Sequence, residues 1–126
     1  MRVHIVKYNL KSVVAKIARF KFEEVPRVET ETAIYQIIDG HDIGPSFLGH
    51  LIERIEGRPG GIADLGACQA VVERLHSLGV VHRDLNRYNF VISPSGVILI
   101  DFENAMKSGD KEAMQKEFVQ LAEQLF

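Results

Sequence analysis

Several features that mark secreted and membrane proteins are absent from the sequence. The chain has a single cysteine, Cys68, which excludes an internal disulfide and favours a reducing compartment. No apolar run approaches the roughly 20 residues that a membrane-spanning helix needs, and the first residues lack the apolar core of a signal peptide. We therefore expect a cytoplasmic protein that does not associate with a membrane.

The chain also lacks a large excess of charge of either sign. Its 126 residues include 15 Lys and Arg and 17 Asp and Glu, for a formal net charge of -2 at pH 7. Proteins that bind nucleic acid through a broad surface usually carry a basic excess, so we expect no nucleic-acid partner. The length and the hydrophobic content of 46% are typical of one modest domain with its own core. Nothing in the composition predicts the oligomeric state.

The most informative stretch runs from residue 80 to residue 103, VVHRDLNRYNFVISPSGVILIDFE. Two apolar segments in it are separated by Ser93-Pro94-Ser95-Gly96, a turn signal, and this pattern predicts a β-hairpin. Such a hairpin would bring Asp84, Asn89 and Asp101 close together. Two carboxylates and an amide supply the oxygen ligands that suit Mg²⁺, with one acid left to act as a base.

The order of these residues carries a family resemblance. HRDLNRYN followed by DFE resembles the catalytic loop and the metal-binding triplet of the protein-kinase-like superfamily. The resemblance implies a phosphotransferase that uses ATP and Mg²⁺. By that resemblance, Asp84 accepts the proton of the attacking hydroxyl group, and Asn89, also a catalytic-loop residue, holds Mg²⁺ together with Asp101.

A lysine and a glutamate upstream fit the same resemblance. Residues 13–20 are rich in β-branched side chains and predict a strand, and the VAK within it resembles the family's third-strand lysine motif. Lys16 would then contact the nucleotide phosphates. Residues 28–39 predict a helix, and Glu31 lies on the same face of it as two isoleucines. The resemblance makes Glu31 the ion-pair partner of Lys16 at the cofactor site, with Glu29 as the alternative.

The predicted elements describe an α+β fold, a reduced version of the kinase-like domain over residues 1–126. Residues 1–56 predict the remnant of an N-lobe, with a small antiparallel sheet and one helix. Residues 57–126 predict a truncated, mainly helical C-lobe that carries the catalytic hairpin. Four further segments are expected: one strand or two very short ones at 46–55, a flexible connector at 56–61, and helices at 64–79 and 111–126.

Two departures from the protein-kinase pattern turn the resemblance toward small-molecule kinases. Asn86 stands two residues after Asp84, where Ser/Thr protein kinases commonly carry lysine, and Glu103 replaces the glycine of the DFG triplet. Both resemble the aminoglycoside-phosphotransferase-like and lipopolysaccharide-kinase-like branch, in the small compact form familiar in fungi. The partners implied are a nucleotide and a small hydroxyl-bearing substrate.

A third departure keeps an alternative function open. No glycine precedes Lys16, so the Gly-rich loop that covers the nucleotide phosphates in the family is absent or replaced. The alternative is a non-catalytic pseudokinase or scaffold with weak or no nucleotide binding.

Overall fold

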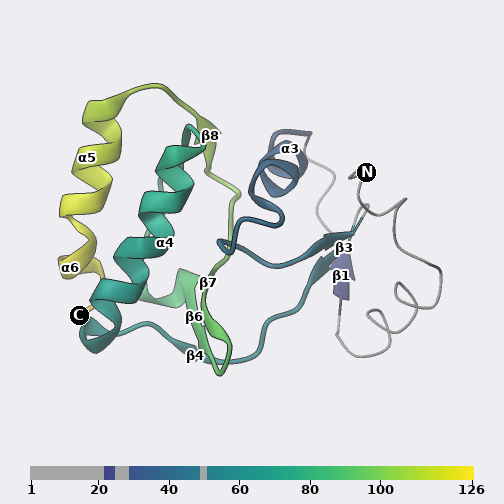
Figure 1. The fold of residues 1–126 in the computed structure, drawn as a ribbon, viewed down its shortest axis with the longest axis horizontal. Helices are drawn as coiled ribbons and strands as arrows, with labels where there is room; N and C mark the ends of the chain where they lie inside the picture. The colour runs from purple at the N-terminus through teal and green to yellow at the C-terminus, as the bar shows by residue number, and fades with distance from the viewer. Residues whose placement is uncertain (1–21, 25–28, 49–50) are drawn as a thin grey trace.

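The structure is a computed structural model that describes residues 22–24, 29–48 and 51–126 (Figure 1). It has two groups of elements along its long axis. One group holds helix α3 and a small antiparallel sheet, and the other holds helices α4, α5 and α6 with a β-hairpin. The predicted α+β class, with short antiparallel sheets and helices, is confirmed. The strands expected in residues 1–20, and Lys16 with them, lie outside the described residues.

The first group is built from four short elements. They are β1 (Phe22–Glu24), α3 (Glu29–Ile38), β2 (Phe47–Leu48) and β3 (Leu51–Glu53). The three strands form one antiparallel sheet in the order β1-β3-β2, in which Phe22 pairs with Glu53 and Phe47 with Ile52. The segment at 46–55 therefore contains two very short strands, which was the second of the two arrangements expected.

Helix α3 lies within two residues of its predicted bounds and anchors the first group to the second. Its buried face carries Ile34, Tyr35 and Ile38, each no more than 3% exposed. The Tyr35 ring meets the ring of Phe102 edge to face, with the centroids 5.4 Å apart. The helix is followed by Gly40, whose positive φ of 83° favours glycine after a helix end.

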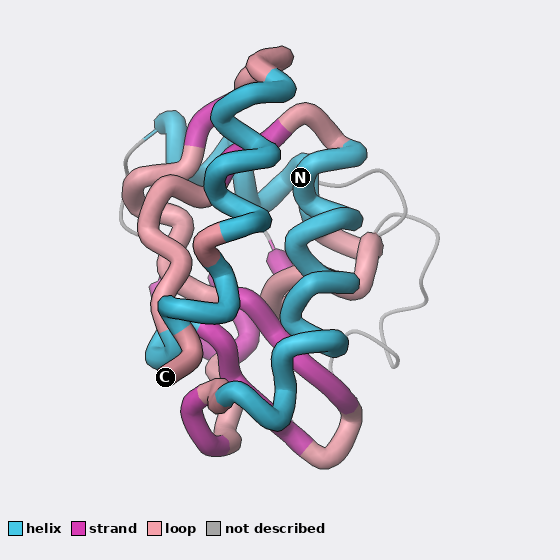
Figure 2. Tube along the Cα trace, turned by 90° about the vertical axis from the view of Figure 1, so that its left-hand side faces the viewer, coloured by secondary structure: helices cyan, strands magenta, loops and turns pink. Residues whose placement is uncertain are grey.

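The second group holds the remaining elements. They are β4 (Arg58–Pro59), η1 (Ile62–Asp64), α4 (Leu65–Ser77), β5 (Val80–Val81), η2 (Arg87–Asn89), β6 (Phe90–Ser93), β7 (Gly96–Leu99), β8 (Met106–Lys107), α5 (Lys111–Val119) and α6 (Leu121–Gln124). Figure 2 shows α5 and α6 running alongside α4, with the strands behind them. No helix in the described ranges is both long and apolar enough to cross a membrane.

The core forms where α4 meets the hairpin and the last helices. The apolar stripe of α4 recurs at three or four residues, and its members are at most 1% exposed: Cys68, Val71, Val72 and Leu75. Burial, and then the negative charge of Asp64, raise the pKa of the Cys68 thiol to about 11. Cys68 is therefore a protonated core residue, as its place in the stripe predicts.

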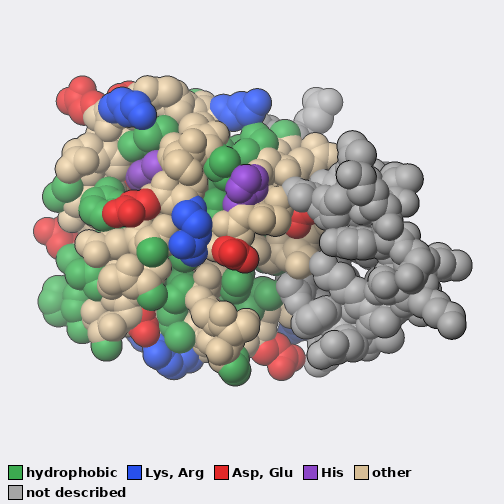
Figure 3. All heavy atoms as spheres, viewed as in Figure 1, with side chains coloured by type: hydrophobic (Ala, Val, Ile, Leu, Met, Phe, Trp, Pro, Cys, Tyr) green, Lys and Arg blue, Asp and Glu red, His purple; other side chains and the backbone are tan. Residues whose placement is uncertain are grey.

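Two predicted segments differ from the structure. Residues 56–61 are not a free connector, because β4 pairs antiparallel with β6 and makes a three-stranded sheet with the hairpin, in the order β4-β6-β7. The helix expected over residues 111–126 ends at Val119 and resumes as α6 after Gln120. Over the described part of the face in Figure 3, acidic and basic side chains are interspersed, in keeping with the balanced charge.

The connector can lie against β6 because Gly57 has no side chain. A Cβ atom at this position would lie 2.3 Å from the carbonyl oxygen of Ile92 and 2.8 Å from a methyl group of Val91. We expect Gly57→Ala to lower the free energy of unfolding by about 1–3 kcal/mol, because backbone atoms must shift to make room. Urea unfolding measures this change.

A matched control is Gly66→Ala in α4, where a Cβ atom meets nothing within 4 Å. Alanine is the better helix former, so this variant should be no less stable than the parent and up to ~1 kcal/mol more stable. Equal stability of the two variants would contradict the close packing of the connector on β6.

Candidate active site

The loop after β5 brings Asp84 and Asn89 together. The Asn86 Oδ1 atom accepts the N–H of Tyr88 at 2.9 Å, which caps the short helix η2 and turns the chain back. Asn89, at the end of η2, is buried, and its Nδ2 atom donates to the Asp84 carbonyl at 2.8 Å. The same Nδ2 atom lies 3.4 Å from Asp84 Oδ2. The predicted base and one predicted metal ligand are thus neighbours.

The end of the hairpin places Asp101 next to this loop. The Ile100 N–H donates to the Asn89 carbonyl at 2.8 Å, so the chain enters the DFE triplet directly beside Asn89. Asp101 has a φ of 60°, in the left-handed region that non-glycine residues seldom occupy. Asp101 is exposed, whereas the next residue, Phe102, is fully buried. Glu103, which stands in the place of the glycine of DFG, does not have a positive φ. The left-handed residue of the triplet is Asp101.

His82 connects the loop that holds Asp84 to the DFE triplet. Its ring is fully buried and meets the ring of Phe102 edge to face at 5.0 Å. Nε2 lies 2.9 Å from the Ile100 carbonyl, and Nδ1 lies 3.2 Å from the backbone nitrogen of Asp84. A carbonyl only accepts and a backbone N–H only donates, so Nε2 carries the proton and the ring is neutral. Burial lowers the pKa of His82, which makes it a packing residue of the loop.

A carboxylate from α5 holds the start of the loop. Glu117 Oε2 accepts the N–H of Arg83 at 2.7 Å, and Oε1 accepts the N–H of His82 at 3.2 Å. His76 Nε2 donates to Oε1 at 2.7 Å. Arg83 has a φ of 71°, so this carboxylate stabilises a backbone conformation that is unfavourable by itself. Burial alone would raise the pKa of Glu117, but these hydrogen bonds more than offset that effect and lower it.

Glu117 was not predicted from the sequence, although its position held a signal. It lies three residues after Met114 and four before Leu121, and both of these are buried. An acid within an apolar helical stripe requires a hydrogen-bonding partner. Two of its partners are backbone N–H groups more than thirty residues earlier, which no side-chain pattern reveals, and the third is the His76 side chain of α4.

Glu31 lies where the inner face of α3 approaches the triplet. It is 8% exposed, and its pKa is raised by burial and then by the negative charges of Asp101 and Glu103. Glu31 and Asp101 are thus within range of an electrostatic interaction. Its ion pair with Lys16 stays a prediction, as does the alternative at Glu29, because Lys16 lies outside the described residues.

The donor atoms present suit a magnesium–nucleotide complex. Among the residues that the structure describes, no group of three or more His, Cys, Asp or Glu side chains forms a metal site. Asn89 and Asp101 offer one amide and one carboxylate oxygen instead. Mg²⁺ usually binds to one or two carboxylates and completes its shell with water and substrate phosphates. Asn89 and Asp101 thus fit a cation that is bound partly by nucleotide phosphates. They do not make a metal site from protein ligands alone.

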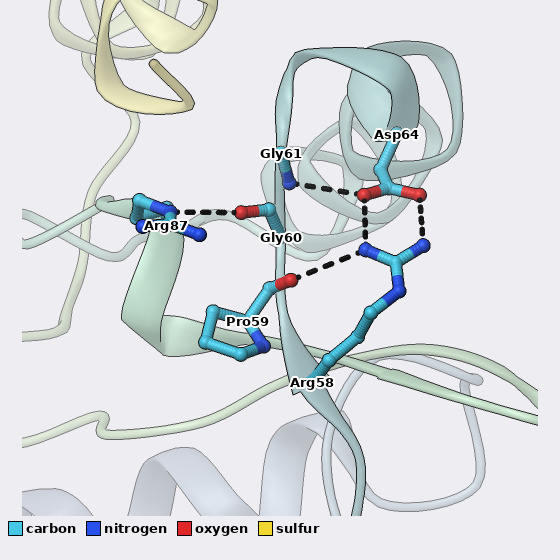
Figure 4. A network of polar contacts seen from close by, with 6 residues as sticks. All are labelled: Arg58, Pro59, Gly60, Gly61, Asp64 and Arg87. Carbon is cyan, nitrogen blue, oxygen red and sulfur yellow. Dashed lines mark hydrogen bonds and ion pairs between the residues drawn. The ribbon is translucent and has the colours of Figure 1, made fainter.

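The connector is tied to the catalytic loop by a polar network (Figure 4). Arg58 makes two hydrogen bonds, of 2.9 and 3.0 Å, to the carboxylate of Asp64, which also accepts the N–H of Gly61. Arg87 Nε donates to the Gly60 carbonyl at 3.1 Å, and the Gly60 N–H donates to the Arg87 carbonyl at 2.9 Å. Asp64 lies directly before α4, but its carboxylate binds these groups and does not cap α4.

A pocket of about 540 Å³ opens beside the predicted base. Residues 83–86 of the catalytic loop form one wall, and helices α5 and α6 form the other. The helical wall consists of Ala113, Lys116, Glu117, Gln120 and Gln124. A space of this size accommodates a small molecule next to Asp84.

Comparison with known protein families agrees with this geometry. The sequence model of the RIO domain family matches residues 63–119, which is just under half of the chain. This part of the chain is protein-kinase-like. The matched segment includes Asp84, Asn89 and Asp101 and ends at the last residue of α5. No curated protein matches the chain. The match is to a RIO domain and gives no support to the narrower resemblance to aminoglycoside and lipopolysaccharide kinases.

The tautomer of His82 is open to direct measurement. We expect nitrogen-15 chemical shifts to show the proton on Nε2 and the ring neutral through the range in which free histidine becomes charged, near pH 6.5. Because the pKa is lower in the folded protein, the stability contribution of His82 is complete above pH 6.5 and lost as the pH falls through the folded value. The same ring in urea-unfolded protein is the control, and identical titrations in both states would contradict burial of a neutral ring.

The importance of Glu117 can be measured by unfolding as a function of pH. We expect Glu117→Gln to lower the free energy of unfolding at pH 7 by about 2 kcal/mol, because charge-assisted hydrogen bonds to buried groups are lost. The folded pKa lies below the ordinary value of 4.5, so the wild-type advantage is complete above that pH and shrinks as the pH falls through the folded value.

Glu112→Gln is the matched control, because Glu112 is an exposed acid on the same helix. It should change stability by less than about 0.5 kcal/mol. A loss that is equal in the two variants, or that does not vary with pH, would show that Glu117 does not hold the loop.

Proposed function

We propose that the protein is a phosphotransferase that uses ATP and Mg²⁺ and acts on a hydroxyl group of a small molecule. The observation that carries the proposal is the arrangement of Asp84, Asn89 and Asp101. Asp84 and Asn89 are hydrogen-bonded to each other, and the Ile100 N–H fixes the start of the triplet to Asn89. All three lie in the segment that is similar to a RIO domain, a kinase-like phosphotransferase fold.

Phosphoryl transfer requires positioning and charge neutralisation more than covalent chemistry from the protein. Asp84 accepts a hydrogen bond from the acceptor hydroxyl, aligns it for attack and takes its proton. The Asn89 amide holds Asp84 in place through Nδ2, and its oxygen and the Asp101 carboxylate would bind Mg²⁺. When bound, Mg²⁺ neutralises charge on the nucleotide phosphates. Lys16 would contact those phosphates, and Glu31 would orient Lys16.

The pocket beside Asp84 supports a small acceptor. Its volume of about 540 Å³ lies within the range of roughly 300–1,000 Å³ that is usual for small-molecule sites. Asp84 forms part of its wall, so an acceptor bound there has a hydroxyl group within reach of the base.

A specific observation favours the second candidate, a pseudokinase or scaffold. Residues 1–15, ahead of Lys16, contain no glycine, so they offer no counterpart of a Gly-rich backbone cradle. On this alternative, the hydrogen-bonded loop persists as a structural element without turnover.

Nucleotide titration distinguishes the two functions. Calorimetry should show ATP binding that requires Mg²⁺, and Asp101→Asn should weaken it by about tenfold or more, because a charged ligand to the cation is lost. Asp84→Asn should leave ATP binding intact and reduce acceptor-stimulated release of ADP by about 10²- to 10⁴-fold, the usual contribution of a positioned base.

Asp42→Asn is the matched control. Asp42 is an exposed aspartate with a φ of 57°, close to the 60° of Asp101, and asparagine tolerates that conformation as aspartate does. It should change neither quantity. The absence of binding at millimolar ATP, in a sample that unfolds cooperatively, would favour the scaffold.

A further inference from the structure

The wall that α5 and α6 contribute to the pocket is one continuous helical face. Lys116, Gln120 and Gln124 follow one another at intervals of four residues, across the break between the two helices. Side chains at this spacing lie one above another. The opposite stripe, which includes Met114 and Leu121, is buried in the core. The polar stripe therefore faces the catalytic loop as a ladder of one cation and two amides.

The acidic side chains of the pocket already have a structural or proposed catalytic role, whereas its basic side chains have no ion-pair partner within the described ranges. Glu117 is held by His76 and by the N–H groups at the start of the loop, and Asp84 is the proposed base. Within the described ranges, Lys116 forms no ion pair, not even with Glu112 one turn earlier. The Arg83 guanidinium group donates one hydrogen bond, to the sulfur of Met106 at 3.1 Å, and likewise forms no ion pair in that part of the chain. Two positive side chains thus border the pocket without a carboxylate partner among the residues that the structure describes.

The side-chain amides of the pocket also divide into one that is hydrogen-bonded within the loop and two that are not hydrogen-bonded within the described residues. Asn86 is used by the loop, since its Oδ1 atom accepts the N–H of Tyr88 and its Nδ2 atom donates to the Asp84 carbonyl. Gln120 and Gln124 are exposed and form no side-chain hydrogen bond within the described residues. Each can both donate and accept, which suits the hydroxyl groups of a ligand.

We propose that this pocket is the acceptor site and that it takes a small hydroxyl compound bearing an anionic group. Lys116, with Arg83 at the pocket's edge, binds the anion, and Gln120 and Gln124 bind further oxygens. One hydroxyl group then lies at Asp84. The inference rests on the proposed phosphotransfer, and it names the chemical class of the acceptor. The reaction that follows moves the terminal phosphoryl group of ATP to that hydroxyl oxygen and releases ADP, with the hydroxyl proton going to Asp84.

A titration without nucleotide tests the pocket apart from the phosphotransfer. Glycerate and glycerol are suitable probes, because both carry hydroxyl groups and only glycerate has a carboxylate. Glycerate should shift the backbone amide resonances of residues 83–86 and 113–124, and it should bind roughly tenfold more tightly than glycerol. Lys116→Gln should remove that preference, and Lys116→Arg should retain most of it.

Lys111→Gln is the control, since Lys111 is an exposed lysine on the same helix and does not line the pocket. It should bind glycerate as the parent does. Equal affinities for glycerate and glycerol, or a preference that survives in Lys116→Gln, would overturn the proposal. Shifts at these residues with an acidic serine-containing peptide, and none with glycerate, would also overturn it and would indicate a protein acceptor.

The two proposals fail in different ways. If glycerate binds through Lys116 but Mg²⁺–ATP does not bind, the phosphotransfer is wrong and the anion pocket stands. If Mg²⁺–ATP binds and glycerate shows no preference over glycerol, the phosphotransfer stands and the acceptor class is wrong.

Discussion

One carboxylate determines the conformation of the candidate active site. Glu117 reaches from α5 to the backbone N–H groups of His82 and Arg83, and a third hydrogen bond from His76 fixes it to α4. The backbone of Arg83 has a positive φ, which this interaction stabilises in a non-glycine residue. The direction in which the chain leaves Arg83 places Asp84 at the pocket. The loop is therefore held by the two helices of the core.

The DFE triplet is held by a second set of contacts that converge on the same loop. His82 binds the carbonyl that precedes Asp101 and packs against Phe102, while Phe102 packs against Tyr35 of α3. Burial of the aromatic ring and exposure of the neighbouring carboxylate are thus two results of one backbone turn at Asp101. The buried rings of His82 and Phe102 thus support the polar side chain of Asp101. Catalysis that depends on precise positioning requires such a rigid support.

Local patterns predicted the parts of the fold that depend on local interactions. Periodicity gave α3 and α4 nearly to their ends, and Ser93-Pro94-Ser95-Gly96 gave the hairpin. The pairing of β4 was missed, because its Gly- and Pro-rich composition is typical of loops and its partner strand lies some thirty residues later. For the site, motif order identified Asp84, Asn89 and Asp101. Glu117 was missed because two of its three partners are backbone N–H groups, which no side-chain pattern identifies.

Pairing of β4 also limits how the two groups of elements can move. The connector is hydrogen-bonded to β6 from Arg58 onward, and Gly60 is fastened to the catalytic loop through Arg87. A domain closure over a bound nucleotide cannot bend the chain there without breaking this sheet. The connector and the catalytic loop therefore form one continuous part of the second group, and only the chain ahead of Gly57 lies outside this packing.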